Sequence, residues 1–150
     1  MGVMTRCDQP CHLGLDLNPM LKLSGDKGNV YHAMKTVDPG FNGFAEAYFS
    51  SIFYGARKGW KKHTQMTLNI IVPVGEIRFV VVSEDQVSNF FDVTLSLANY
   101  QRLTVPPGLW VAFEGIGSGC NMLLNMANVI HDPKESETLR LDEIEFDWHD

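Results

Sequence analysis

The sequence has no long hydrophobic run, and its beginning lacks the apolar centre of a secretion signal. The most apolar stretch, residues 68–83, is interrupted by proline, glycine, glutamate and arginine, so no segment is expected to cross a bilayer. The first 16 residues include Arg6, Asp8 and Pro10, which a signal peptide does not carry in its apolar region. We therefore expect neither a membrane partner nor secretion.

Cysteine is scarce. Cys7, Cys11 and Cys120 are an odd number, without the paired spacing of a zinc site. Free thiols in a reducing cytoplasm are the expectation. A redox or metal fragment formed by Cys7 and Cys11 is the alternative.

Basic residues are also in short supply. The chain has 12 Lys and Arg against 18 Asp and Glu, and its net charge of −6 argues against a nucleic-acid partner. Hydrophobic residues make up 45% and charged residues 20% of the 150 positions, which excludes a disordered chain. A chain of this length is expected to form one domain.

Short segments of β-type composition alternate with turns along most of the chain. In Glu76–Ser83, apolar residues at every second position predict a half-buried strand, and Gly75 supplies the turn from Thr67–Val74. Further strands are expected at Asn29–Met34, Ala45–Phe53, Asp92–Leu97, Gln101–Val105, Leu109–Glu114 and Asn121–Ala127. Many short strands with turns about every ten residues predict an all-β sandwich or barrel.

Two regions depart from this pattern. Residues 1–24 show no clear period and are expected to form an N-terminal arm or edge segment ahead of a single domain over residues 25–150. Only Asn42–Tyr48 and Glu135–Leu139 offer room for a helical turn or two.

Two spaced motifs suggest a fold. The first contains Lys61, His63, Leu68 and Gly75, and the second contains Pro106, Gly108 and Val111. Their spacing resembles the two signature motifs of the cupin superfamily, whose fold is a jelly-roll β-barrel. In that superfamily two His and a Glu of the first motif and a His of the second hold a metal, whereas three of these positions here are Lys61, Leu68 and Val111. One imidazole does not hold a divalent cation alone, so we expect no metal and no cofactor, and the lost ligands argue against a metal-dependent cupin enzyme.

Several further segments are similar to the dTDP-4-dehydrorhamnose 3,5-epimerases, which are metal-independent cupins. They are Asp26-Lys27-Gly28, Lys58-Gly59 ahead of His63, Val74-Gly75-Glu76, Tyr100–Gly108 and Leu139–Glu143. The segments Trp60–Asn69 and His131-Asp132-Pro133 resemble an epimerase-related subgroup from polysaccharide gene clusters. The resemblance implies an isomerase or epimerase that acts on a nucleoside-diphosphate 4-keto-6-deoxy sugar in surface-polysaccharide synthesis.

The resemblance also implies catalytic residues. A 4-keto sugar acidifies the hydrogens on the neighbouring carbons, and His63 matches the position of the base that removes one. Asp142 matches the carboxylate that would bond the other ring nitrogen and stabilise the imidazolium.

The expected substrate contacts surround His63. Lys61 or Lys62 would meet the enolate oxygen, and strand alternation directs Lys61 inward with His63 and Lys62 outward. The other substrate-binding candidates are Arg57 and Lys58 for a diphosphate, Trp60 and Trp110 for stacking on a base or sugar, and Asn69 and His131 for the cavity. Each also has an ordinary structural interpretation, in packing, in a turn or in a solvated loop.

Departures from the epimerase pattern leave the reaction open. The family's second-motif His is Val111 here, its Lys ahead of the second strand aligns with about Leu68, and its general-acid Tyr falls within residues 124–130, which contain no Tyr. Single-centre epimerisation, keto-isomerisation and a non-catalytic cupin that binds a sugar or nucleotide are the alternatives. The resemblance further implies a homodimer, because the family pairs its barrels and exchanges edge strands.

Overall fold

The computed structural model describes residues 5–7, 13–86 and 89–149, and the regular structure of these residues is almost entirely β. The strands are β1 (Thr5–Cys7), β2 (Asp16–Pro19), β3 (Lys22–Gly25), β4 (Gly28–Tyr31), β5 (Glu46–Ile52), β6 (Arg57–His63), β7 (Leu68–Val74), β8 (Glu76–Ser83), β9 (Asn89–Ser96), β10 (Gln101–Val105), β11 (Leu109–Gly115), β12 (Asn121–Ala127) and β13 (Ser136–Thr138). Three-residue 3₁₀ turns lie at Glu84–Gln86, Pro133–Glu135 and Leu141–Glu143. The all-β prediction is confirmed.

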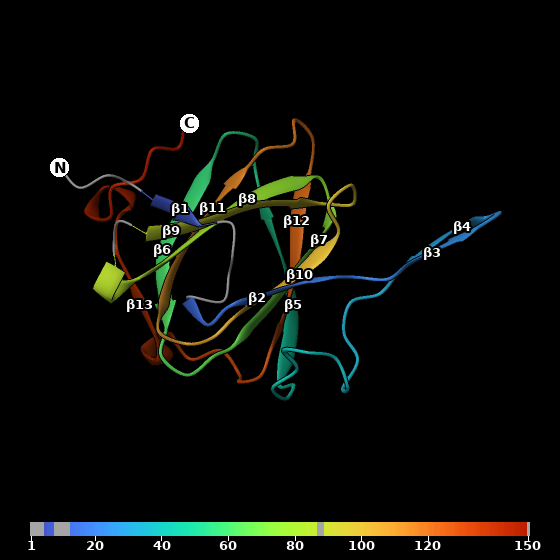
Figure 1. Ribbon diagram of the computed structural model, residues 1–150, viewed down its shortest axis with the longest axis horizontal. Helices are drawn as coiled ribbons and strands as arrows, with labels where there is room; N and C mark the ends of the chain where they lie inside the picture. The colour runs from blue at the N-terminus through green and yellow to red at the C-terminus, as the bar shows by residue number, and fades with distance from the viewer. Residues whose placement is uncertain (1–4, 8–12, 87–88, 150) are drawn as a thin grey trace.

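Two sheets face each other and form the body of the molecule (Figure 1). The first, called sheet A, has the order β1-β9-β8-β11-β6-β13, and the second, sheet B, has the order β2-β10-β7-β12-β5. All pairings within the sheets are antiparallel except that of β1 with β9. Apolar side chains from both sheets fill the space between them.

Strand β8 shows how sequence alternation builds this core. Ile77, Phe79 and Val81 point into the space between the sheets, as the period of two predicts. The prediction of a half-buried strand is wrong for the other face, where Val80 and Val82 are also buried. The C-terminal segment covers that face with Phe146 and its neighbours, which form a second apolar cluster.

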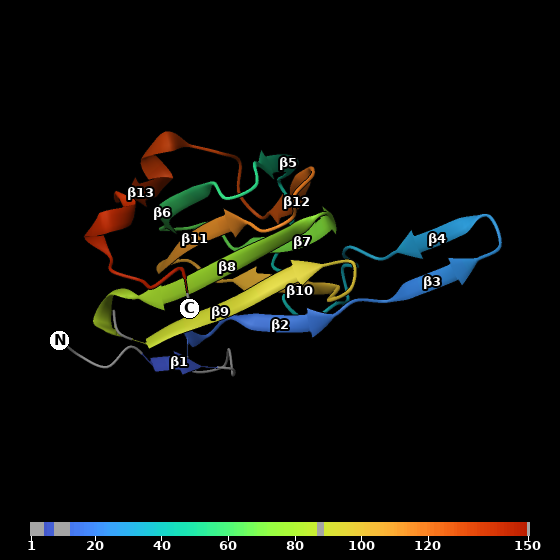
Figure 2. The ribbon, with the colours of Figure 1, turned by 90° about the horizontal axis from the view of Figure 1, so that it is seen from above.

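The first residues contribute to the sheets and to a projecting hairpin. Strand β1 pairs with β9 and strand β2 pairs with β10, so the arm expected at residues 1–24 supplies an edge strand to each sheet. Among the described strands, β3 and β4 pair only with each other, and they project away from the body (Figures 1 and 2). Cys11 lies outside the described residues, as does the side chain of Cys7.

The two segments with room for helix are extended instead. Strand β5 begins at Glu46 and pairs along its whole length with β12. A 3₁₀ turn at Pro133–Glu135 is followed at once by β13, which pairs with β6. Pairing with distant strands decides both conformations, which local sequence does not specify. Within the described ranges, no helix is long and apolar enough to cross a membrane.

Candidate active site

A cavity of about 260 Å³ lies between the two sheets. Sheet A contributes side chains from β6 and β11, and sheet B contributes side chains from β5, β7 and β12. The lining residues are Tyr48, Ser50, Lys58, Gly59, Lys61, His63, Leu68, Ile70, Val111, Phe113, Leu123 and Asn125. The wall is thus mainly apolar, with a few polar groups at defined positions, which is typical of a small-molecule site.

The positions that hold a metal in the cupin motifs meet in this cavity. Lys61 and His63 stand two residues apart on β6 and therefore point to the same side. Val111 pairs directly with Lys61 across the β6–β11 register, and Leu68 begins β7. The Gly108 backbone N–H donates to the His63 carbonyl at 2.7 Å and joins the second motif to the first. Among the residues described, no group of three His, Cys, Asp or Glu side chains is placed to hold a metal ion.

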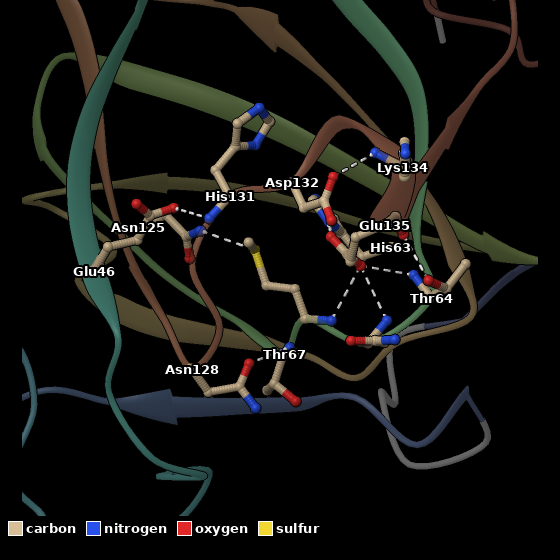
Figure 3. Close-up of polar contacts among 12 residues, drawn as sticks. Glu46, His63, Thr64, Thr67, Asn125, Asn128, His131, Asp132, Lys134 and Glu135 are labelled. Atoms are coloured by element: carbon tan, nitrogen blue, oxygen red, sulfur yellow. Dashed lines mark hydrogen bonds and ion pairs between the residues drawn. The ribbon is translucent and has the colours of Figure 1, made fainter.

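His63 is held by a buried carboxylate (Figure 3). Its Nδ1 lies 2.6 Å from Glu135 Oε1, and the two side chains are only 8% and 6% exposed. Glu135 ends the 3₁₀ turn that precedes β13, and the pairing of Ser136 with His63 brings the two residues together.

Backbone donors fix the Glu135 carboxylate further. Its Oε2 accepts from the N–H groups of Thr64, Gln65 and Met66 at 2.8, 2.9 and 3.2 Å. Burial raises the pKa of the Glu135 carboxyl, but the hydrogen bonds from His63, Gln65 and Met66 outweigh it and lower that pKa to about 2. Glu135 is therefore ionised at neutral pH and accepts from Nδ1–H, which leaves the Nε2 lone pair of the neutral imidazole available as a base.

The expectation that Asp142 bonds His63 is wrong. Asp142 lies in the exposed 3₁₀ turn Leu141–Glu143, where its carboxylate accepts from Arg140 Nε at 3.1 Å and is 76% exposed. Glu135 occupies the Nδ1 side of the ring in its place. The resemblance near the C-terminus predicted a carboxylate seven residues too late in the chain. It did not include the pairing of the short strand β13 with β6, which brings Glu135 to His63.

The lysines of β6 point as strand alternation predicts. Lys61 lines the cavity, whereas Lys62 points outward and forms ion pairs with Glu84 at 2.6 Å and Glu137 at 3.1 Å. Lys58 also lines the cavity, and its ammonium donates to the Ser51 carbonyl at 2.7 Å.

Arg57 does not line the cavity. Its guanidinium pairs with Glu114 at 2.5 Å and lies 5.3 Å from the Trp148 ring centroid on the outer side of sheet A. The structure thus separates it from Lys58 and Lys61, with which the sequence grouped it.

Both tryptophans proposed for stacking lie outside the cavity. Trp60 and Trp110 belong to the second apolar cluster, on the outer face of sheet A. Trp60 is fully buried and donates through Nε1 to the Leu141 carbonyl at 3.3 Å, and Lys62 sits 5.0 Å from the Trp110 ring centroid. Because Lys61 and Val111 face inward, their strand neighbours Trp60 and Trp110 must face outward.

Asn69 does not share the cavity with His63. Its neighbours Leu68 and Ile70 line the cavity, and Asn69 points to the other side of β7. There its amide donates to the Gly40 carbonyl at 3.1 Å and accepts from Thr104 Oγ1 at 2.6 Å. An even separation of six residues would put Asn69 and His63 on the same side only within one continuous strand. Here a loop joins His63, at the end of β6, to Leu68, at the start of β7.

His131 is exposed and is not a lining residue. Its backbone N–H donates to Glu46 at 2.8 Å, in the turn that leads to Asp132 (Figure 3).

Sequence reasoning missed three polar lining residues as well as Glu135. They are Tyr48 and Ser50 on β5 and Asn125 on β12, where Tyr48 and Asn125 are direct partners across the pair of strands. Alternation along β12 singles out Asn125 as an inward polar residue between Leu123 and Ala127. No local pattern indicates that β5 pairs with β12.

Comparison of the sequence with protein-family models and with curated protein sequences finds no match. Comparison of the structure finds a dTDP-sugar isomerase from Desulfovibrio desulfuricans, with a TM-score of 0.83 and 31% identity over 90% of both chains. A dTDP-4-dehydrorhamnose 3,5-epimerase from Bacillus anthracis, with TDP and PPi bound, has a TM-score of 0.79 and 17% identity over 91% of this chain and 85% of its own. A 3,4-ketoisomerase from Thermoanaerobacterium thermosaccharolyticum, in complex with TDP-4-keto-6-deoxyglucose, has a TM-score of 0.71 and 16% identity over 87% and 93%. The last two share the fold alone.

Proposed function

The chain belongs to the family of dTDP-sugar isomerases and epimerases with a cupin-like fold, and we propose that it acts on a nucleoside-diphosphate 4-keto-6-deoxy sugar. It is a sugar-nucleotide isomerase or epimerase. One observation carries this conclusion: the 31% identity with a dTDP-sugar isomerase extends over 90% of both chains. The mixed apolar and cationic cavity around His63 is consistent with it.

His63 is the base in this proposal. Its Nε2 removes a proton from a carbon next to the ketone, and the electron pair of that C–H bond delocalises onto the carbonyl oxygen. Ionised Glu135 holds the ring orientation and stabilises the imidazolium that forms, which supports His63 in this role.

Lys61 and Lys58 supply positive charge at the same wall of the cavity. A cation placed where negative charge develops stabilises an enolate more than it stabilises the ketone. In this proposal Lys61, two residues from His63 on β6, meets the enolate oxygen, and Lys58, nearer the start of the strand, meets the diphosphate; their position in the cavity lining supports both roles. We assign no substrate contact to Arg57, because Glu114 already pairs with it.

The experiment that tests this function is hydrogen exchange at the sugar ring. The wild-type protein is incubated in D₂O with dTDP-4-keto-6-deoxyglucose, and deuterium at the ring carbons next to the ketone is followed by NMR. We expect exchange with the wild type and a loss of at least about 100-fold in His63→Asn.

His131→Asn is the matched control, because His131 is exposed and outside the cavity lining. It should exchange at the wild-type rate. Binding of dTDP without any exchange in the wild type would indicate a non-catalytic sugar-nucleotide binder, and equal exchange in His63→Asn and wild type would remove His63 from the mechanism.

We also propose a homodimer in the cytoplasm. The β3–β4 hairpin is exposed at all eight of its strand positions and carries the apolar residues Leu23 and Val30 on one face. An isolated two-stranded hairpin is marginally stable in water, so a second copy of the chain that covers these residues would account for its projection from the body. The exposed free thiol of Cys120 suits a reducing compartment.

A further inference from the structure

Glu135 lies at a place where strand pairing alone holds the chain weakly. It ends the 3₁₀ turn Pro133–Glu135, directly before β13, which is only three residues long. Among the described strands, β13 forms an edge of sheet A and pairs only with β6. Short edge segments open locally more readily than the centre of a sheet. A carboxylate that must stay in contact with His63 therefore needs further contacts.

Thr64 supplies three of these contacts. Its backbone N–H donates to the Glu135 carboxylate at 2.8 Å and to the Glu135 carbonyl oxygen at 2.9 Å. Its hydroxyl bonds the same carbonyl oxygen at 2.6 Å. A carbonyl oxygen only accepts, so the hydroxyl is the donor. One residue thus holds both the main chain and the side chain of Glu135 (Figure 3).

The place of Thr64 in the chain gives these bonds their consequence. Thr64 directly follows His63, the last residue of β6. A movement of Glu135 away from Thr64 therefore also changes the 2.6 Å distance between Glu135 Oε1 and His63 Nδ1. The branched side chain of threonine has few rotamers, so its hydroxyl is already directed before the bond forms.

The contact between Glu135 and His63 determines which ring nitrogen is a base. A neutral imidazole carries its proton on one nitrogen and a lone pair on the other. With the carboxylate in place the proton stays on Nδ1, and the lone pair is on Nε2. When the carboxylate moves away, the proton can sit on Nε2, and Nε2 then accepts no proton from a substrate.

We propose that Thr64 is a positioning residue for the base. Its hydroxyl holds the Glu135 carbonyl, and through the Glu135 carboxylate it keeps His63 in the Nδ1–H tautomer. This inference rests on the proposed function, in which His63 Nε2 removes the ring proton. Thr64 is exposed and is not a lining residue of the cavity, so it acts through Glu135.

The first test is kinetic and uses Thr64→Val, which removes the hydroxyl and keeps the branched shape. Hydrogen exchange into dTDP-4-keto-6-deoxyglucose in D₂O is followed by NMR. The kcat for exchange should fall about 10-fold, because small displacements of catalytic groups are costly. The KM should stay within about twofold of wild type, because Thr64 does not contact the substrate.

Two further variants separate the hydroxyl from a general effect on the strand. Thr64→Ser keeps the hydroxyl and should exchange within about twofold of the wild-type rate. Thr138→Val is the matched control, because it makes the same change at an exposed residue of β13, and it should exchange at the wild-type rate.

The second test reads the His63 tautomer directly and needs no substrate. Nitrogen NMR of the imidazole at about pH 9, where an ordinary histidine is neutral, distinguishes the two tautomers. The signals that disappear in His63→Asn assign the ring. Wild type, Thr64→Ser and Thr138→Val should show the Nδ1–H tautomer, and Thr64→Val should show a mixture of both.

Three results would overturn the proposal. The first is a Thr64→Val variant with the kcat and the tautomer of wild type. The second is a lower kcat with His63 still wholly in the Nδ1–H tautomer, which would mean that Thr64 acts by another route. The third needs no variant: a wild-type His63 in the Nε2–H tautomer. A wild type that exchanges no ring hydrogen would instead overturn the proposed function, and the tautomer measurement would still decide what Thr64 does to His63.

Discussion

At the scale of single residues, His63 depends on one carboxylate that lies 72 positions later in the chain. Glu135 bonds the ring with one oxygen and three backbone N–H groups with the other. These donors lower the pKa of its carboxyl to about 2, compared with an ordinary value of 4.5. The folded state therefore binds this proton less tightly than the unfolded state, so the carboxylate stabilises the fold above pH 4.5 and loses that contribution as the pH falls towards 2.

Glu135→Gln should remove this dependence on pH. The difference in unfolding free energy between wild type and variant should shrink by about 2 kcal/mol between pH 6 and pH 3. Urea unfolding at the two pH values measures it. A constant difference would show that the Glu135 carboxyl titrates normally in the folded protein, and the exposed Glu145→Gln is the control.

At the scale of elements, the glycine turn between β7 and β8 ties two parts of the fold together. Gly75 has φ of +75°, a conformation that L side chains rarely adopt. A Cβ atom there would lie within 2.3 Å of both Asn121 Oδ1 and the Cys120 carbonyl oxygen. The turn thus packs directly against the start of β12.

Gly75→Ala should therefore destabilise the fold more than the same change at a glycine with a similar backbone conformation and open surroundings. Gly55 has φ of +76°, and a Cβ atom at that position would meet no other atom within 4 Å, so Gly55→Ala reports the backbone cost alone, about 1 kcal/mol. We expect Gly75→Ala to cost at least about 2 kcal/mol more because of the steric clash. Equal midpoints in urea for the two variants would show that β12 moves away without cost.

At the scale of the whole molecule, the projecting hairpin is the feature that one copy of the chain does not explain. Leu23 and Val30 are direct partners across β3 and β4, so they share one face, and they are 47% and 58% exposed. Exposed apolar surface of this kind is typical of a contact with another molecule.

If the proposed homodimer forms through this hairpin, Val30→Lys should shift the protein from dimer to monomer at micromolar concentration, because it would place a charge in the proposed apolar contact. Light scattering coupled to gel filtration measures the mass. Asn29→Lys, on the other face of the same hairpin, is the matched control and should stay dimeric. A monomeric wild type, or a Val30→Lys variant as dimeric as wild type, would contradict the proposed assembly.

Local sequence determined much of the fold. Segments of β-type composition between glycine and proline turns predict β7, β8, β10, β11 and β12 to within a residue or two, because strand propensity and turn chemistry are properties of the local sequence. The spacing of Lys61, His63, Leu68 and Val111 likewise indicated four positions that meet in one cavity. Alternation within β6 also separated inward Lys61 from outward Lys62.

The tertiary structure alone decided which distant groups face His63. Side-chain alternation does not extend through a loop, so it could not predict that Asn69 points away from the cavity. Tyr48 enters the cavity from β5, a strand that carries no recognised motif. The pairing of β13 with β6 chose Glu135 over Asp142, and the C-terminal segment buried Trp60 and Trp110. Strand pairing joins residues far apart in sequence, and the free energy that selects the pairs comes from the assembled core, which no local pattern contains.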